Sequence, residues 1–108
     1  MTTDEFANLS QKLTDHVNSL LFSKAKEYAT EDRLFNFRQM TSLFHTNPAQ
    51  VALFYQSKHY ASIAKMAEDI DKGIIPSEEL ILEKVGDLVA YSYLVFACLM
   101  EQKDGKTS

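Results

Sequence analysis

The sequence contains few residues that interrupt helices and almost none that cross-link chains. Its 108 residues include three glycines, two prolines and one cysteine. Scarce helix breakers, placed mainly between apolar segments, favour a small number of long helices. The single cysteine, Cys98, excludes a disulfide within one chain, and its apolar neighbours are typical of a core position in a reducing compartment.

Basic runs and long apolar runs are also missing. The net charge is -4 with a pI near 5.3, and the Lys and Arg residues are dispersed. Bulk nucleic acid is therefore excluded as a partner, because neutralising phosphates requires a concentrated basic face. The longest apolar run, Leu94 to Met100, is far shorter than the roughly 20 residues of a membrane span. With no signal-like N-terminus, the sequence predicts a soluble cytoplasmic protein without a membrane partner.

The signatures of several common catalytic sites do not occur. There is no Gly-rich phosphate loop, no nucleophile elbow and no Cys-x-x-Cys motif. His16 and His45 have no neighbours at ligand spacing, so a zinc site is not predicted. Covalent catalysis by serine or cysteine has no support in the sequence.

Helical periodicity is the dominant pattern that is present. Apolar residues recur every three or four positions in segments at about 3–28, 34–44, 48–70 and 77–102, with no strand-like alternation. They predict an all-α, four-helix up-and-down bundle with three long helices and one short helix across one end. This single domain is expected over residues 1–102, and residues 103–108 are expected to be a disordered polar tail.

Two boundaries of the third helix carry specific signals. Asn47 precedes Pro48 and is followed by Gln50, a pattern of cap, first-turn proline and capping box. Lys72 before Gly73 predicts the end of the same helix. The far half of the last helix is apolar on several faces, which favours a central position or a homo-oligomer, dimer or tetramer, built through it.

An acidic pair near the start of the last helix indicates a neighbouring cation or metal ion. Glu83 and Asp87 are four residues apart, so they share a helical face, and the residues that follow are apolar. A carboxylate that faces a core needs a cation or a metal beside it, because otherwise it is strongly destabilising or takes up a proton.

A second acidic pair suggests what that partner is. Glu27 and Glu31 have the same spacing at the end of the first helix. If the two helices face each other, Glu27, Glu31, Glu83 and Asp87 converge, and such a set of carboxylates suits Mg²⁺. Two alternatives stay open. Either pair can be a solvated helix face, or Asp87 can be the buried ion-pair partner of Lys58.

The corner between the first two helices is dense in charged and aromatic residues. Lys24 and Arg33 are candidate phosphate ligands, and Tyr28 is a candidate for stacking on a base. Asn36 is a further candidate substrate contact. The alternative interpretation is a hydrogen-bonded corner in which Asn36 satisfies backbone groups.

Lys58 and His59 interrupt the apolar pattern of the third helix. Lys58 is a candidate phosphate ligand as well as a candidate ion-pair partner. His59 lies about 100° round the helix from Lys58 and has no evident orienting partner. It is interpreted as a packed or surface histidine.

Four spaced blocks occur between residues 24 and 101. They are Lys24-x-x-x-Tyr28, Arg33-Leu34-x-Asn36-Phe37, Lys58-His59-x-x-Ser62-Ile63 and Glu83-Lys84-x-x-Asp87-x-x-x-Tyr91. Together they resemble a family of small proteins encoded by bacteriophages and prophages, which implies the host-cell cytoplasm as the location. That family is in turn similar to the all-α MazG-type nucleoside triphosphate pyrophosphohydrolases.

The MazG-type resemblance implies a specific chemistry. Such proteins bind Mg²⁺ through a Glu-Glu-x-x-Glu block and a Glu-x-x-Asp block, and they cleave a nucleotide to its monophosphate and pyrophosphate. Glu83-Lys84-Val85-Gly86-Asp87 matches the second block except that Lys84 replaces the glutamate three before the aspartate. A complete metal site then requires Glu83 or another acid to substitute.

Two functions are therefore expected from the sequence. The first is a Mg²⁺-dependent nucleotide pyrophosphohydrolase, with Glu83 and Asp87 as catalytic residues and metal ligands. The second is a non-catalytic phage protein that binds a host factor or sequesters a nucleotide, with Lys58 and Asp87 as internal structure.

Overall fold

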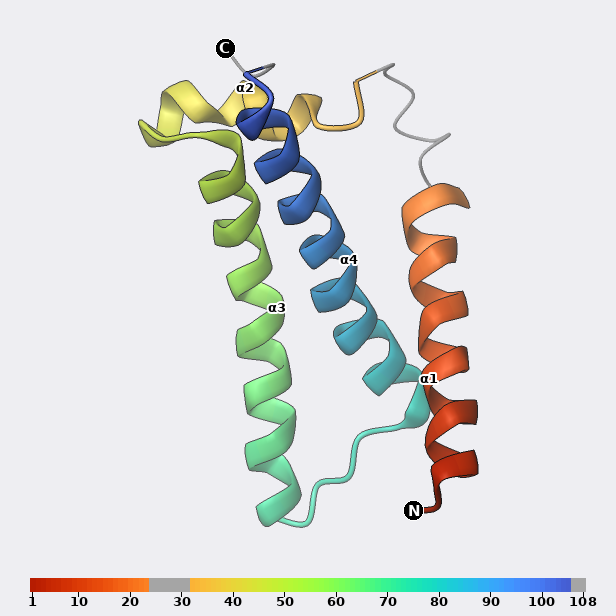
Figure 1. Cartoon of the computed structure of the whole chain (residues 1–108). Coiled ribbons are helices and arrows are strands. Elements are labelled where there is room, and N and C mark those ends of the chain that lie inside the picture. Colours follow the sequence, from red (N-terminus) through yellow and green to blue (C-terminus); the bar gives the residue numbers. More distant parts are fainter. Residues whose placement is uncertain (24–31, 106–108) are drawn as a thin grey trace.

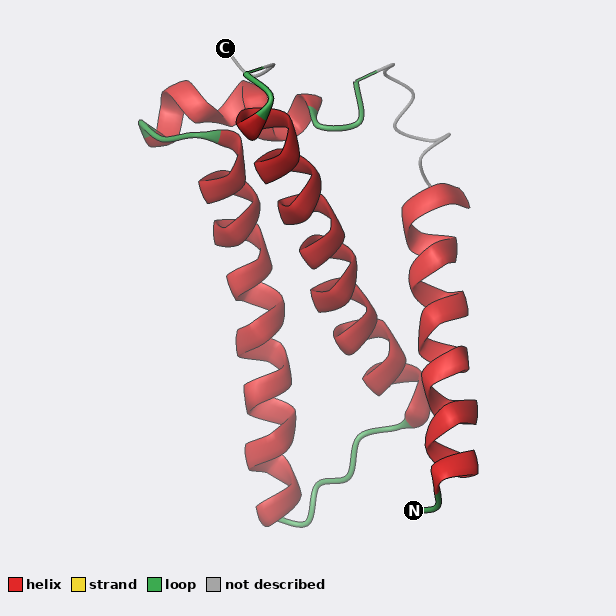
Figure 2. Cartoon of the chain, in the orientation of Figure 1, coloured by secondary structure: helices red, strands yellow, loops and turns green. Residues whose placement is uncertain are grey.

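The computed structural model describes residues 1–23 and 32–105. Its elements are α1 (Thr3–Asn18), the π-helical continuation η1 (Ser19–Ser23), α2 (Phe35–Phe44), α3 (Pro48–Asp71) and α4 (Glu78–Lys103). Within these residues all regular structure is helical and no strand occurs (Figure 2). The prediction of an all-α helical bundle is confirmed.

Helix α4 lies at the centre of the bundle. α1 packs on one side of α4 and α3 on the other, while α2 crosses the end where α3 begins and α4 finishes (Figure 1). α1 and α4 run in the same direction and α3 runs in the opposite one. The central position of the last helix and the crossing position of the short helix agree with the sequence prediction.

A capping box begins α1. The Thr2 hydroxyl accepts a hydrogen bond from the Glu5 backbone N–H at 3.1 Å, and the Glu5 carboxylate accepts one from the Thr2 N–H. Helical structure then continues to Ser23, with the last five residues in π-helical geometry. The remainder of the expected first helix, residues 24–28, lies outside the described residues.

The chain enters α2 through a turn stabilised by Asp32. One carboxylate oxygen of Asp32 accepts a hydrogen bond from the Leu34 N–H at 3.1 Å. α2 ends at His45, which adopts a left-handed conformation with φ of 53°.

Caps set the limits of α3 and α4. The Asn47 side chain accepts a hydrogen bond from the Gln50 N–H at 3.0 Å, and Gly73 follows the end of α3 with φ of 81°. The Ser77 hydroxyl accepts one from the Leu80 N–H at 3.1 Å and begins α4. α4 continues through Lys103, the first residue of the expected tail, and residues 106–108 lie outside the described residues.

Two separate clusters of buried side chains hold the bundle together. The first joins α2, α3 and α4 and consists of Leu34, Phe37, Ala49, Val51, Ala52 and Cys98. The second joins α1 and η1 to α4 and consists of Val17, Leu21 and Ala90. α1 is therefore attached to the remainder of the fold through α4, with a smaller core of its own.

Cys98 occupies the core position that its apolar neighbours predicted. Its side chain is almost fully buried between α2 and α3. Burial, together with the negative charge of Glu101, raises the pKa of the Cys98 thiol to about 11. The thiol is therefore protonated at neutral pH and does not act as a nucleophile.

Many large apolar side chains remain on the surface of the described helices. They include Phe6, Phe22, Leu43, Tyr60 and Phe96, each more than 60% exposed. None of the helices in the described ranges combines the length and apolarity needed to cross a membrane.

Candidate functional site

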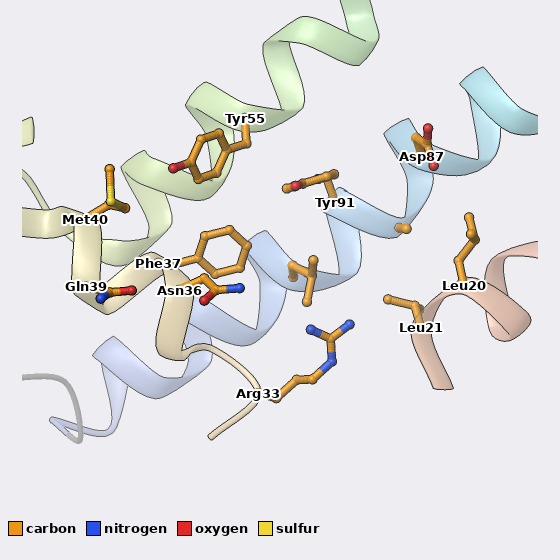
Figure 3. Close-up of a pocket in the computed structure, with 12 residues that line it drawn as sticks. Leu20, Leu21, Arg33, Asn36, Phe37, Gln39, Met40, Tyr55, Asp87 and Tyr91 are labelled. Atoms are coloured by element: carbon orange, nitrogen blue, oxygen red, sulfur yellow. The ribbon is translucent and has the colours of Figure 1, made fainter. Parts of the chain in front are cut away.

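A cavity of about 520 Å³ lies between η1, α2, α3 and α4. Residues of both core clusters contribute to its lining. Its lining consists of Leu20, Leu21, Arg33, Asn36, Phe37, Gln39, Met40, Tyr55, Asp87, Ala90, Tyr91 and Leu94 (Figure 3). The volume falls within the range of roughly 300–1,000 Å³ that small-molecule sites occupy. This cavity is the candidate functional site.

Two arginines near the start of α2 have different roles. Arg38 pairs with Asp32 at 3.2 Å and with Glu101, so it joins the α2 turn to the end of α4. Arg33 forms no ion pair or side-chain hydrogen bond within the described residues. Its guanidinium extends into the cavity between Asn36 and Leu21 (Figure 3). Among the described residues that line the cavity, Arg33 is therefore the cation available to a ligand.

Aromatic rings form the wall of the cavity opposite η1. Phe37 is buried between two tyrosines, with its ring centroid 6.1 Å from that of Tyr55 and 6.2 Å from that of Tyr91. The latter pair meets edge to face, an arrangement that the ring quadrupoles favour. The two tyrosines belong to α3 and α4, so Phe37 fixes α2 against both helices.

Asp87 lies on the α4 side of the cavity beside His59. Its Oδ2 atom is 3.7 Å from His59 Nδ1, and the His59 ring lies 5.1 Å from the Tyr91 ring at an interplanar angle of 30°. His59 is thus a packed histidine, as the sequence interpretation had it. Asp87 and Tyr91 were not predicted as the partners of His59, although their four-residue spacing places both on one face of α4.

Glu83 does not accompany Asp87 into the cavity. The Glu83 side chain is 60% exposed and lies 3.8 Å from the Lys84 ammonium, whereas the Asp87 side chain is 29% exposed. The two residues share a helical face, but Glu83 is one turn beyond the residues that line the cavity. The expectation that both carboxylates face a core is wrong for Glu83.

Lys58 is not the ion-pair partner of Asp87. Its ammonium lies over the rings of Phe54 and Tyr55, 5.9 and 5.5 Å from their centroids. The adjacent residue on α3, His59, takes the place beside Asp87 instead. Lys58 contacts Tyr55, a cavity residue, but does not itself line the cavity. The buried Lys58–Asp87 pair expected as an alternative is therefore not formed.

The other predicted site residues lie outside the described part of the chain. They are the phosphate ligand Lys24, the stacking residue Tyr28 and the metal ligands Glu27 and Glu31. Among residues 1–23 and 32–105, no group of three His, Cys, Asp or Glu residues is placed to hold a metal ion. Of the four predicted metal ligands, Asp87 is the one that lines the cavity within those ranges.

A close contact between α1 and α4 supports the wall formed by η1. A Cβ atom on Gly86 would lie 2.5 Å from His16 Cδ2 and 2.9 Å from His16 Nε2. The imidazole therefore occupies the space that any larger residue at this position of α4 would need. His16 Nε2 is buried and has no hydrogen-bond partner in the described ranges. His16 has no neighbours at metal-ligand spacing in the sequence, and this packing role was not predicted.

Comparisons with protein-family models, curated proteins and solved structures find no match for this chain.

Proposed function

We propose that the chain binds a nucleoside phosphate in the cavity between η1, α2, α3 and α4. One observation carries the proposal. Arg33, Asn36 and Asp87 were selected from the sequence as nucleotide-site residues, and all three line the same cavity although Asp87 is more than 50 residues away.

The charge distribution suits a phosphate. Arg33 and Asp87 are the charged residues of the lining, and Arg33 has no ion pair among the described residues. A guanidinium can donate two parallel hydrogen bonds to a phosphate, and such charge-assisted bonds are among the strongest available to a protein. The phosphate end of the ligand is therefore assigned to the part of the cavity that Arg33 enters.

The remainder of the lining suits a base and a sugar. Tyr55 and Tyr91 offer ring surfaces, and Leu94 offers an apolar contact. The side-chain amides of Asn36 and Gln39 form no hydrogen bond within the described residues, so their donors and acceptors are available to a base edge. An arginine, aromatic rings and free amides in one cavity match the three chemical parts of a nucleotide.

Removing the Arg33 cation should weaken nucleotide binding. We expect Arg33→Ala to raise the dissociation constant for nucleoside triphosphates about 10- to 100-fold, because a hydrogen bond to a charged group contributes roughly 1.5–3 kcal/mol. Isothermal titration calorimetry with each triphosphate, in Mg²⁺, measures this change. Lys65→Ala is the matched control, because Lys65 is a surface cation of α3 paired with Asp69. Equal weakening by both variants would contradict a phosphate site at Arg33.

Mg²⁺-dependent pyrophosphohydrolysis is the second candidate function. Its supporting observation is that Asp87, a predicted metal ligand, faces the same cavity as Arg33. No group of three His, Cys, Asp or Glu residues that could hold a metal ion occurs among the described residues. No catalytic step is therefore assigned to a metal.

The variant Asp87→Asn separates catalysis from structure. The side chain keeps its shape and leaves no buried lysine unpaired, so the free energy of unfolding should change by less than about 1 kcal/mol. Pyrophosphate release from nucleoside triphosphates in Mg²⁺, if Asp87 is catalytic, should fall at least about 100-fold. Thermal melts check the fold. Wild-type protein that binds nucleotides yet releases no pyrophosphate would identify the non-catalytic alternative, nucleotide sequestration.

A further inference from the structure

An uncharged surface runs along the side of α3 and α4 that faces away from the cavity. It consists of Leu53 and Tyr60 on α3 and of Tyr93, Phe96, Leu99 and Met100 on α4. These six side chains are between 43% and 68% exposed. They are named here the outer face.

The residues of the outer face lie together because of the way α3 and α4 are joined. The Gln56 amide donates hydrogen bonds to the Leu88 carbonyl at 2.9 Å and to the Ser92 hydroxyl at 2.7 Å. Leu53 and Tyr60 are about one helical turn before and after Gln56, so they flank this junction on α3. Phe96 is one turn after Ser92 on α4. The outer-face residues of α3 and those of α4 therefore lie next to one another where the two helices pack.

The outer face is separate from the candidate site. Asp87 and Phe96 are nine residues apart on α4, a spacing that places them on opposite sides of a helix with 3.6 residues per turn. Asp87 lines the cavity, whereas Phe96 is exposed. A protein seated on the outer face would leave the cavity accessible.

We infer that the outer face binds a second copy of this chain across a two-fold axis. Such an axis joins the same surface of both copies, so a surface with charges of one sign would be repelled by its counterpart. Residues Leu88–Met100 of α4 include no Asp, Glu, Lys or Arg. The outer face is therefore complementary to itself, and it needs no partner of opposite charge.

The area is also sufficient for a stable dimer. Large apolar side chains that are about half exposed each present roughly 100 Å² to solvent, since aromatic residues bury about 150–250 Å² when fully covered. Six such residues amount to roughly 600 Å² on each copy, or about 1,200 Å² for a symmetric pair, the lower limit of standard interfaces. Three of the six are aromatic, the residue class enriched in interface centres.

Sedimentation equilibrium tests the inference on the full chain. Wild-type protein should have twice the 12.3 kDa mass of one chain. Phe96→Glu should raise the dimer dissociation constant at least about 100-fold, because symmetry places two added carboxylates in one interface. Tyr93→Lys is an independent second variant with the same expected direction.

Leu43→Glu is the matched control, because Leu43 is 66% exposed on α2 and does not belong to the outer face. It should leave the dimer intact, and circular dichroism should show unchanged helicity in all three variants because each side chain is exposed. A wild-type mass of one chain would overturn the inference. Equal dimer dissociation constants for Phe96→Glu, Tyr93→Lys and Leu43→Glu would also overturn it.

Discussion

Replacing Phe37 with alanine should lower the free energy of unfolding by about 3–5 kcal/mol. Phe37 is 5% exposed and joins α2 to both Tyr55 and Tyr91. Its removal leaves a void next to an existing cavity. The surrounding helices would have to move to fill that void, so most of the lost packing is not recovered. Urea denaturation followed by circular dichroism measures the loss. The same variant should weaken ligand binding, because Phe37 lines the cavity and packs against Tyr55 and Tyr91.

Phe35→Ala is the control for this prediction. Phe35 is on the same helix, two residues earlier, and is 44% exposed. Truncating Phe35 to alanine should lower the free energy of unfolding by less than about 1.5 kcal/mol, because much of its ring is already exposed to solvent. Equal losses in Phe35→Ala and Phe37→Ala would mean that α2 does not pack on α3 and α4 through Phe37.

Gly86→Ala should destabilise the fold by about 1–3 kcal/mol, although alanine is the better helix former by about 1 kcal/mol. The added methyl group would lie 2.5 Å from a carbon of the His16 ring, which is held between α1 and α4. The ring or the whole of α1 must move to relieve the contact. Chemical denaturation of the variant measures the cost.

A double-mutant cycle identifies the cause. In a His16→Ala background the obstructing ring is absent, so Gly86→Ala should become neutral or stabilise by up to about 1 kcal/mol through helix propensity. The two substitutions should therefore be strongly non-additive. If Gly86→Ala costs the same in both backgrounds, the His16 contact is not what requires glycine at this position.

Helix boundaries were the part of the fold most accessible to sequence reasoning. Asn47 and Ser77 cap their helices through hydrogen bonds to backbone groups three residues ahead, so their effect is encoded within a single turn. The same holds for Gly73, whose positive φ ends the turn after α3. Local chemistry of this kind does not depend on what the helix packs against.

The candidate site was only partly accessible from the sequence. Arg33, Asn36 and Asp87 were chosen for their residue types, and all three line the cavity. Which α3 side chain accompanies Asp87 was not predictable, because Lys58 and His59 are adjacent on α3 and differ by about 100° in direction. The rotation of α3 against α4 brings His59, and not Lys58, to Asp87.

The sequence by itself determined an all-helical chain with capped α3 and α4, because periodicity and capping are local properties. Tertiary structure decided three further matters. It placed α2 across the bundle so that Arg33 enters the cavity, exposed Glu83 while Asp87 lines it, and set His16 against Gly86. These outcomes depend on the angle and rotation at which the helices pack. That packing is determined jointly by many side chains that are far apart in the chain.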